Sequence, residues 1–509
     1  MKMFNFFRRA IQIAAKDKSP HRLLRVFPRC LSTIETPPKE KTVRLSIPKG
    51  IMGQPTCHTH PHLVQPDCLT WGMTQMEYRE RRDRLVNKLV GEAVNMHNTH
   101  IIVIPAARKQ YMSDQIPYVF RQNSDFYYLT GCLEPSAVLV LVKYAQSQDY
   151  RSILFVHDHD AHTEMWEGPR TGCTNSAALF GIDEAVPVEK FGNVMTNLTA
   201  HKSSVLWYHN EMPTNPDVHN TVRAILAGNV SLADPKRALH FMRVVKSPAE
   251  VELMKASCEI GAQSINLAMA CTKPGTSEHL VNAILEYSCK QGGAEHLAFP
   301  PVVAGGPRAT HIHYVANNQK LTENEMLLVD SGCQRWLYNS DMCRTWPVSG
   351  KFSKHHRILY ELVLSVQKRL IEILAEHRPP LHQLFDDMCR LLGHFMQQEG
   401  ILPKHLSGQE LIGRAYRLCP HHVSHYLGLD VHDAPLVPRS VPIAENMVIT
   451  VEPGIYVRPD DTSIPKEFRG VGIRIEDDVL ITEGDPVVLT DSCVKEVADI
   501  EALVGTQSL

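Results

Sequence analysis

The feature that most constrains the fold of this chain is a set of ionisable residues at the ends of short apolar segments in its last third. They lie in the strings MLLVDSG, NSDMCRT, HHVSHYLGLDVHD, ITVEPG and GIRIEDD, and in chain order they are Asp330, Asp341, His425, Glu452 and Glu476. Taken singly, each would more often be a turn residue, a helix cap or a solvated edge. As an ordered set, four carboxylates and one imidazole suit hard or borderline divalent ions such as Mn²⁺, Mg²⁺, Co²⁺ or Zn²⁺. These ligands can hold two ions if some carboxylates bridge, and two ions about 3.5 Å apart activate water.

The segment before the first carboxylate predicts a buried strand. Residues 326–329 are apolar, and Asp330 ends the run. Because Asp341 follows 11 residues later, a hairpin would return it beside Asp330. The two carboxylates are therefore predicted to face one site.

The last two carboxylates have a similar setting. Residues 448–451 predict another buried strand, which ends at Glu452. In GVGIRIEDDVLIT, Arg474 and Glu476 alternate with isoleucines, and alternate residues of a strand point to the same face. A guanidinium and a carboxylate side by side on one sheet face form a plausible catalytic surface.

The rest of the chain shows a mixed pattern of helices and strands. Strand-like runs separated by helical stretches between residues 99 and 210, after a helical segment within 71–95, predict an α/β domain. A capping box with proline at the first helical position opens a long helix at Ser247. Helices are predicted at about 247–270, 278–289, 354–375 and 381–400.

Histidine and cysteine are frequent here, and most of them are interpreted as structural. With 27 histidines in the chain, a lone histidine is more often a packing residue than a catalytic one. We give this interpretation to His311, to His422 and to the HTHPH tract, which contains His58, His60 and His62. The 13 cysteines contain no C-x-x-C pair, which is typical of reduced thiols.

The ordered strings resemble the pita-bread metallopeptidases, which include methionine aminopeptidase, prolidase, creatinase and aminopeptidase P. The resemblance covers about residues 70–505, and HHVSHYLGLDVHD, TVEPGIY and RGVGIRIEDD are most similar to the aminopeptidase P and prolidase branch. GQPTCHTHPHLVQPD, MTQMEYRERRDRLVNKL, RQNSDFYYLTGCLEP and PPVVAGG are similar to its mitochondrial members. The resemblance implies an α/β creatinase-like N-terminal domain at 71–240 and an α+β pita-bread catalytic domain at 241–509.

The resemblance also implies a site with two divalent ions, for which manganese is expected. Asp330 would bind one ion, and Asp341 and Glu476 would bridge both. His425 and Glu452 would complete the shell of the second ion.

Catalytic and substrate-binding roles follow from the same resemblance. His432 in DVHD matches the histidine that binds substrate and steadies the tetrahedral intermediate, and Glu452 is the candidate proton shuttle. Asp330 is the candidate partner of the substrate's α-amine. The catalytic set would be His432, Glu452, His421 and Arg474. The substrate-binding set would be Phe299, His313, Asp330, His425, His432 and Glu452.

Length and charge limit the alternatives. A chain of 509 residues predicts at least two domains, and a net charge of −2 argues against nucleic-acid binding. It has no apolar run of about 18 residues, so no membrane span is expected. The first 31 residues contain eight basic residues and one acid, which predicts a mitochondrial transit peptide and a location in the matrix. A basic disordered tail is the alternative, and residues 32–70 are interpreted as a linker or extended arm.

The function expected from the resemblance is an aminopeptidase that removes one N-terminal residue from peptides or proteins. Proline is the expected second residue, and mitochondrial protein processing is the expected setting. A prolidase-type dipeptidase is one alternative, and a catalytically inactive pita-bread binding protein is another. Family analogy also suggests a homodimer.

Overall fold

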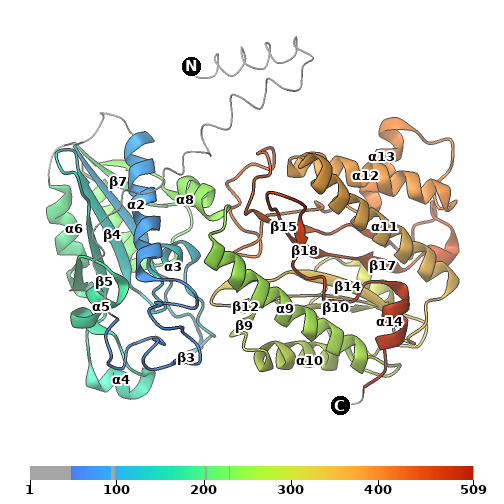
Figure 1. Cartoon of the computed structure of the whole chain (residues 1–509), viewed down its shortest axis with the longest axis horizontal. Coiled ribbons are helices and arrows are strands. Elements are labelled where there is room, and N and C mark those ends of the chain that lie inside the picture. Colours follow the sequence, from blue (N-terminus) through green and yellow to red (C-terminus); the bar gives the residue numbers. More distant parts are fainter. Residues whose placement is uncertain (1–46, 93–97, 201–202, 229, 508–509) are drawn as a thin grey trace, which may run out of the picture. The chain divides into compact units, whose positions relative to one another are not determined.

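The structure is a computed structural model that describes residues 47–92, 98–200, 203–228 and 230–507 (Figure 1). The expected transit peptide at 1–31 and the first part of the expected linker lie outside these residues. Within the described ranges, no helix combines the length and the apolar composition that crossing a membrane requires.

Residues 47–70 differ from the expected linker, because they pack against the N-terminal domain. Met52, Val64 and Leu69 are buried in its core. The Gln54 side chain donates to the carbonyl of Gly131 over 3.1 Å and accepts from the backbone N–H of Leu133 over 2.8 Å. This part of the expected linker therefore belongs to the domain.

The N-terminal domain is built on a six-stranded mixed sheet with the strand order β6-β5-β4-β1-β7-β8. Strand β1 pairs antiparallel with β4 and parallel with β7. The strands of this sheet are β1 (Thr99–Pro105), β4 (Val138–Tyr144), β5 (Arg151–Val156), β6 (Glu184–Pro187), β7 (Ser204–Trp207) and β8 (Ser231–Ala233). A separate hairpin is formed by β2 (Tyr111–Ser113) and β3 (Ile116–Pro117). The predicted α/β character of this region is confirmed.

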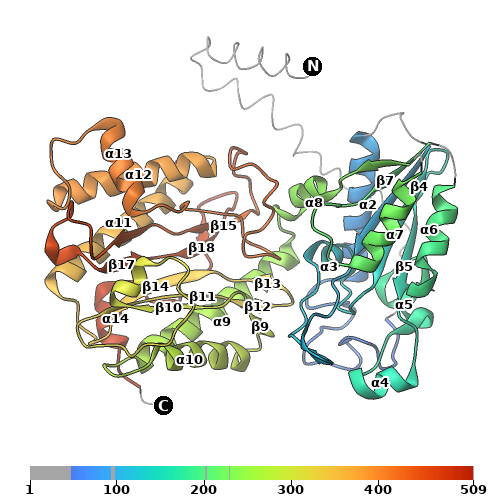
Figure 2. The ribbon, with the colours of Figure 1, turned by 180° about the vertical axis from the view of Figure 1, so that it is seen from behind.

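Alternation of apolar residues along the strands gives this sheet two buried faces (Figure 2). Ile102 and Ile104 face a core shared with α2, α3 and α5, whereas Ile101 and Val103 face a core shared with α6 and α7. The helices of the domain are α2 (Gln75–Glu92), α3 (Ser124–Thr130), α4 (Ala161–Glu167), α5 (Gly172–Phe180), the 3₁₀ turn η3 (Val188–Lys190), α6 (Phe191–Thr199) and α7 (Pro216–Leu226). Helix α8 (Lys236–Arg243) leads into the catalytic domain.

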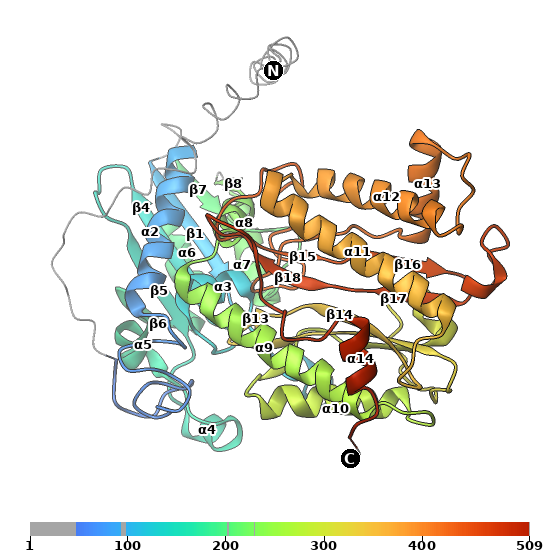
Figure 3. The same ribbon diagram turned by 45° about the vertical axis from the view of Figure 1, so that its right-hand side comes forward.

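The catalytic domain places its strands between two sets of helices (Figures 1 and 3). Helices α9 and α10 lie on one side, and α11 and α12 lie on the other. The helical elements are α9 (Pro248–Cys271), α10 (Glu278–Gln291), η4 (Gly306–Thr310), α11 (Lys354–His377), α12 (Leu381–Gln398), α13 (Gly408–Leu418), η5 (Lys466–Phe468) and α14 (Val497–Leu503). The four helices expected in this region are confirmed within a few residues, and α13 and α14 are additions.

The start of α9 shows why the sequence pattern was reliable there. The Ser247 hydroxyl accepts from the backbone N–H of Glu250, and the Glu250 carboxylate accepts from the backbone N–H of Ser247. Pro248 takes the first helical position, where a missing N–H costs nothing. The predicted capping box is therefore confirmed.

The strands of the catalytic domain form several small sheets that converge on one region. Their bounds are β9 (His296–Leu297), β10 (Val302–Gly305), β11 (Met326–Ser331), β12 (Cys333–Arg335), β13 (Tyr338–Asn339), β14 (Met342–Pro347), β15 (Val448–Val451), β16 (Gly454–Val457), β17 (Val471–Arg474), β18 (Asp477–Leu480) and β19 (Val487–Val488). The sheet orders are β10-β11-β14, β13-β12-β9, β15-β18-β19 and β16-β17.

Strand register brings the predicted ligands together. In the antiparallel pair β11–β14, Asp330 lies opposite Cys343, so Asp341 returns beside Asp330 as the predicted hairpin requires. In the pair β15–β18, Val451 lies opposite Asp477, so Glu452 and Glu476 are close neighbours.

The segment GVGIRIEDDVLIT differs from the single strand expected for it. It divides into β17, which pairs with β16, and β18, which pairs with β15. Glu476 lies in the break between them, and its backbone N–H donates to the carbonyl of Cys343 over 3.0 Å. The predicted common direction of Arg474 and Glu476 is kept, since Arg474 Nε lies 3.9 Å from Glu476 Oε2.

Candidate metal-dependent active site

A pocket of about 1040 Å³ lies in the catalytic domain and is lined by every predicted site residue. These residues are Phe299, His313, Asp330, Asp341, His421, His425, His432, Glu452, Arg474 and Glu476. Most of them come from strand ends and from the loop between α13 and β15. The predicted set is therefore assembled in one place, although the role of each member is a separate question.

Asp341, His425 and Glu476 form the tightest group of ligand atoms. One atom from each lies within 4.8 Å of the others. His425 Nδ1 faces the carbonyl of Tyr426 at 3.1 Å, and since a carbonyl only accepts, Nδ1 carries the hydrogen. The Nε2 atom then faces Asp341 Oδ2 at 3.4 Å with its lone pair directed into the site. This is the tautomer that a metal ligand needs.

The other two predicted ligands flank this group. Asp330 accepts from Arg474 Nη2 over 2.5 Å, while its Oδ1 is buried and has no hydrogen-bond partner among the described residues. Glu452 Oε1 lies 3.7 Å from His425 Nε2, and its Oε2 lies 3.4 Å from His421 Nδ1. Both carboxylates thus keep an oxygen available to a cation.

The electrostatics of the group also fit a bound cation. Burial raises the pKa of Asp330 to about 6, although Arg474 opposes it. Burial raises the pKa of Glu452 to about 7, against His425 and Arg474. For Glu476, burial and then the carboxylates of Asp341 and Glu452 raise the pKa well above its usual range. Four crowded carboxylates are difficult to ionise together without a positive ion, so the donor set fits a divalent metal.

The same crowding also raises the pKa of His425, but for an imidazole a raised pKa favours the charged form. Burial lowers its pKa, but the carboxylates of Asp341 and Glu452 outweigh this and raise the pKa to about 9. Without a metal, these carboxylates therefore favour the protonated ring, and the neutral tautomer described above is the form that would bind an ion.

Tyr456 belongs to the site but was not identified from the sequence. Its hydroxyl accepts from Arg474 Nη1 over 2.6 Å and lies 2.8 Å from His421 Nε2. His421 Nδ1 donates to the carbonyl of His422, so Nε2 accepts the hydrogen of the tyrosine hydroxyl. Burial, and then Arg474, lower the pKa of His421 to about 3, which agrees with a neutral ring. The pairing of β16 with β17 creates this contact, and the sequence alone does not specify that pairing.

Two further groups orient the ligands from behind. Asp478 accepts from the backbone N–H of Asp341 over 2.9 Å and from the Cys258 thiol over 3.2 Å. The Thr450 hydroxyl accepts from the backbone N–H of His425 over 3.1 Å. The EDD run carried the only signal for Asp478, and it resembled a solvated edge.

His432 lies on the pocket wall, with its ring centroid 4.6 Å from that of His425 and the two planes at 74°. It is exposed to the pocket, and burial of the rest of the ring lowers its pKa. His422 also lines the pocket, but its ring stacks on Phe385 at 5.0 Å, in keeping with a packing role. His58, in the HTHPH tract, faces the carbonyl of Ile47.

Comparison with known proteins places the chain in a family. It is 39% identical to Xaa-Pro aminopeptidase 3 of Rattus norvegicus, over 91% of this chain and 92% of that protein. The chain belongs to metallopeptidase family M24. The sequence profile of that family matches residues 252–483, and the profile of the aminopeptidase P N-terminal domain matches residues 78–207.

Other relatives point to the same branch of M24. Intermediate cleaving peptidase 55, mitochondrial, of Arabidopsis thaliana is 36% identical over 89% of this chain and 88% of that protein. Icp55 of Saccharomyces cerevisiae has a similar crystal structure, with a TM-score of 0.76, 32% identity, and coverage of 86% of this chain and 99% of that one. Zinc-substituted aminopeptidase P of E. coli in complex with product has a TM-score of 0.77 at 30% identity, over 85% and 98% of the two chains. The M24 chain described here is a metal-dependent aminopeptidase with the pita-bread fold.

The crowding of carboxylates predicts that Glu476→Gln stabilises the protein without metal but weakens the stabilisation that Mn²⁺ gives. Because the folded state raises the pKa of this carboxyl, the group costs stability at neutral pH when no cation is bound. The variant should therefore raise the melting temperature of the metal-free protein by a few degrees. With Mn²⁺ added, wild type should gain about 2.7 kcal/mol at one hundred times Kd, and the variant much less. Thermal melts with EDTA and with Mn²⁺ measure both effects.

Glu278→Gln is the matched control for this prediction. Glu278 is also a buried carboxylate, but it is paired with Arg308 at 2.6 Å. Its replacement should lower the melting temperature with and without metal, because the Glu278 carboxylate also accepts from the backbone N–H groups of Gly305 and Gln319 and from the Tyr314 hydroxyl. Equal destabilisation of the metal-free protein by both variants would contradict the cation-site interpretation.

Proposed function

We propose that this chain is a dinuclear-metal aminopeptidase that releases a single residue from the N-terminus of peptides or proteins, with proline preferred in second place. The observation that carries the proposal is the convergence of all five candidate ligands and His432 on one pocket. The relatives named Xaa-Pro aminopeptidase 3 support the preference for proline. Manganese is the proposed ion, and a homodimer is the proposed assembly, which sedimentation equilibrium would test.

The proposed ligands divide between two ions in the way the resemblance implies. Asp330 would hold one ion, Asp341 and Glu476 would be shared by both, and His425 and Glu452 would complete the shell of the second ion. Ions bound there supply an activated water molecule and polarise the scissile carbonyl.

The remaining steps are carried by side chains of the chain itself. Asp330 is held by Arg474 and is the proposed partner of the substrate's α-amine. His432, at the exposed pocket wall, is placed to donate a hydrogen bond to the oxyanion as it develops. Glu452, whose carboxylate lies 3.4 Å from His421 Nδ1, is the proposed carrier of a proton to the leaving nitrogen.

The preference for proline has a physical basis in the substrate. Proline lacks the backbone N–H that most peptidases engage, so the pocket must recognise the ring by shape. Apolar side chains line the pocket beside the ligands, including Phe299, Val302 and Ile312. This wall is the proposed contact surface for the proline ring.

We place the enzyme in mitochondria, where it would trim single residues from imported proteins. The basic, acid-poor composition of residues 1–31 and the relatives named intermediate cleaving peptidase 55 support this location. A reporter fused to residues 1–31 should co-localise with a matrix marker. A reporter that stays in the cytosol would remove the support for this setting.

The peptidase proposal is tested with a matched peptide set. Xaa-Pro-Yaa, Xaa-Ala-Yaa and the dipeptide Xaa-Pro are incubated with the full chain, with and without Mn²⁺. Manganese-dependent release of Xaa from Xaa-Pro-Yaa alone is the expected result. Cleavage confined to the dipeptide would identify a prolidase, and equal cleavage of Xaa-Ala-Yaa a broader trimming enzyme. Metal binding without any cleavage would identify a binding protein.

A further inference from the structure

The backbone of one short loop determines where His432 lies. His432 is exposed to the pocket, so its position follows the loop that runs from Gly428 to Ala434. Both the backbone N–H and the side-chain amide of Asn339 donate to the carbonyl of Gly428, each over 2.9 Å. The N–H of Asp433 donates to the carbonyl of Tyr426 over 2.9 Å. The loop is thus tied down on both sides of the histidine.

The conformation of the loop needs outside support. Ala434 has φ +49°, in the left-handed region that a residue with a Cβ rarely adopts. Such a conformation persists only where the surroundings enforce it. A Cβ on Gly428 would come within 2.5 Å of Asp433 Oδ2, so the two ends of the loop are also packed closely together.

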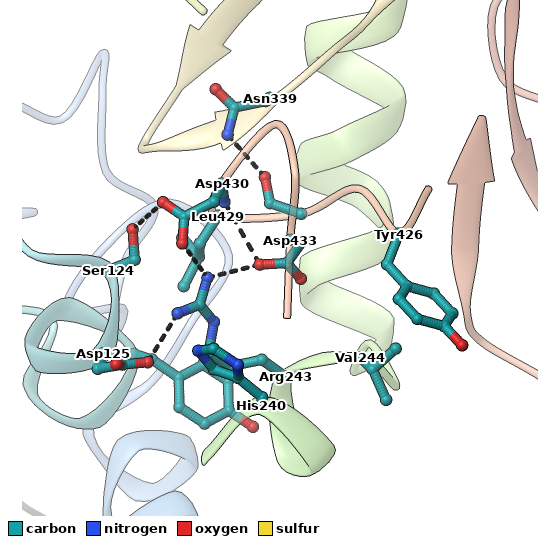
Figure 4. A network of polar contacts seen from close by, with 12 residues as sticks. Ser124, Asp125, His240, Arg243, Val244, Asn339, Tyr426, Leu429, Asp430 and Asp433 are labelled. Carbon is teal, nitrogen blue, oxygen red and sulfur yellow. Dashed lines mark hydrogen bonds and ion pairs between the residues drawn. The ribbon is translucent and has the colours of Figure 1, made fainter. Parts of the chain in front are cut away.

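Arg243, the last residue of α8, is the main support (Figure 4). Its Nη2 donates to Asp430 Oδ2 over 2.6 Å and to Asp433 Oδ1 over 2.5 Å, on either side of His432. Its Nη1 donates to Asp125 Oδ1 over 2.6 Å. The side chain of Arg243 is only 2% exposed, so these contacts are sheltered from water.

Asp125 and its neighbour Ser124 come from α3 of the N-terminal domain. The Ser124 hydroxyl donates to Asp430 Oδ1 over 2.6 Å. Arg121, in the segment before α3, donates to the carbonyl of Leu429 and pairs with Asp430. Leu429 and Asp430, just before His432 in the loop, are therefore bound to groups about 300 positions away in the chain.

The network is balanced in charge. Lys246 Nζ lies 3.3 Å from Asp433 Oδ2, which adds a cation on the side of the catalytic domain. The cations are Arg121, Arg243 and Lys246, and the carboxylates are Asp125, Asp430 and Asp433. Although burial raises the pKa of Asp430, Arg243 and Arg121 hold it well below its usual range. Removing one partner of such a buried set leaves an uncompensated charge, so replacing any one of these residues should shift the loop.

We infer that Arg243, Asp433 and Asp125 are positioning residues for His432, and that the N-terminal domain thereby helps to set the catalytic histidine. This inference rests on the role proposed above for His432. The network fixes Asp430 and Asp433, one on each side of the histidine, and leaves its imidazole free to meet the substrate. Because His432 would act on the oxyanion and not on substrate in its ground state, a shift of the loop should lower kcat more than it changes KM.

The test is a double-mutant cycle with the manganese-loaded full chain and an Xaa-Pro-Yaa peptide. Asp125→Asn and Asp433→Asn are each made in wild type and in the His432→Ala background. In wild type, Asp125→Asn should lower kcat about 10-fold and Asp433→Asn about 30-fold, with KM within about twofold. In the His432→Ala background, neither should lower the residual rate by more than about twofold. If the variants acted through a general loss of stability, they would instead lower the rate equally in wild type and in the His432→Ala background.

Glu77→Gln is the matched control. Glu77 lies on α2 of the N-terminal domain and accepts from the Ser247 hydroxyl, at the start of α9, over 2.6 Å. It therefore links the same two domains without touching the loop. Its kcat should stay within about twofold of wild type. The inference would be overturned if Asp125→Asn and Asp433→Asn kept the kcat of wild type. It would also be overturned if they lowered kcat equally in the His432→Ala background, or if Glu77→Gln lowered kcat as much as they do.

A crystal structure of Asp433→Asn separates this inference from the proposed function. A displaced His432 imidazole is the expected result, and an imidazole in the wild-type position would overturn the inference whatever the enzyme hydrolyses. Failure of wild type to cleave the peptide, or full activity of His432→Ala, would overturn the proposed function instead.

Discussion

Asp341→Ala should reduce kcat/KM for an Xaa-Pro-Yaa peptide by about 10⁴-fold while the fold is retained. Asp341 is the proposed bridge between the two ions, and its carboxylate lies 3.4 Å from His425 Nε2. Without it, the proposed ions would lose a ligand, and the water activation that they would supply should be lost. The fold should survive because the change removes a negative charge from a crowded group. Steady-state kinetics measures the activity, atomic spectroscopy measures the metal content, and far-ultraviolet circular dichroism checks that the fold is retained.

Asp460→Ala is the control for that loss. Asp460 is largely exposed, and its ion pair among the described residues is with Arg458, 3.1 Å away, an exposed pair of small energetic value. Its activity and metal content should match wild type. Activity of Asp341→Ala within tenfold of wild type, with the fold intact, would show that this residue is not a bridging ligand.

The second large effect is expected for His432→Ala. Loss of one oxyanion donor commonly lowers kcat by 10²–10³-fold, and His432 is the proposed donor on the pocket wall. Metal content should stay at the wild-type value, because His432 is outside the ligand group. KM should change little, since the interaction forms as charge develops. Steady-state kinetics and a manganese titration followed by calorimetry check these expectations.

His311→Ala serves as the comparison for this variant. His311 is exposed, and the sequence placed it among the structural histidines. Its kcat should remain close to wild type. A loss of activity in His432→Ala that is matched by a loss of manganese would assign His432 to the metal shell and not to the oxyanion.

The sequence could predict the candidate ligands because each ends a local pattern. The apolar run before Asp330 and the run before Glu452 specify buried strands, and a strand that ends in a carboxylate delivers it to a sheet edge. The capping box at Ser247 likewise depends on residues three positions apart. Signals of this kind are complete within about ten residues, so one chain is enough to recognise them.

The features of the site that the sequence did not predict depend on contacts between distant segments. Tyr456 reaches His421 and Arg474 only because β16 pairs with β17. The break at Glu476 arises because β17 and β18 pair with different partners, although their alternation is continuous in the sequence. Arg243 gave no signal in the sequence, since its three carboxylates come from a loop and a helix that meet only in the fold.

The packing of residues 47–70 sets a limit on maturation of the N-terminus. Met52, Val64 and Leu69 are core residues, each of which contributes about 1.5–3 kcal/mol when fully buried. Gln54 also satisfies the carbonyl of Gly131 and the N–H of Leu133. A processing peptidase that cut beyond Met52 would open the core and leave these backbone groups unpaired. If the N-terminus is processed, the cut should therefore lie upstream of Met52, and trimming past that point should destabilise the enzyme.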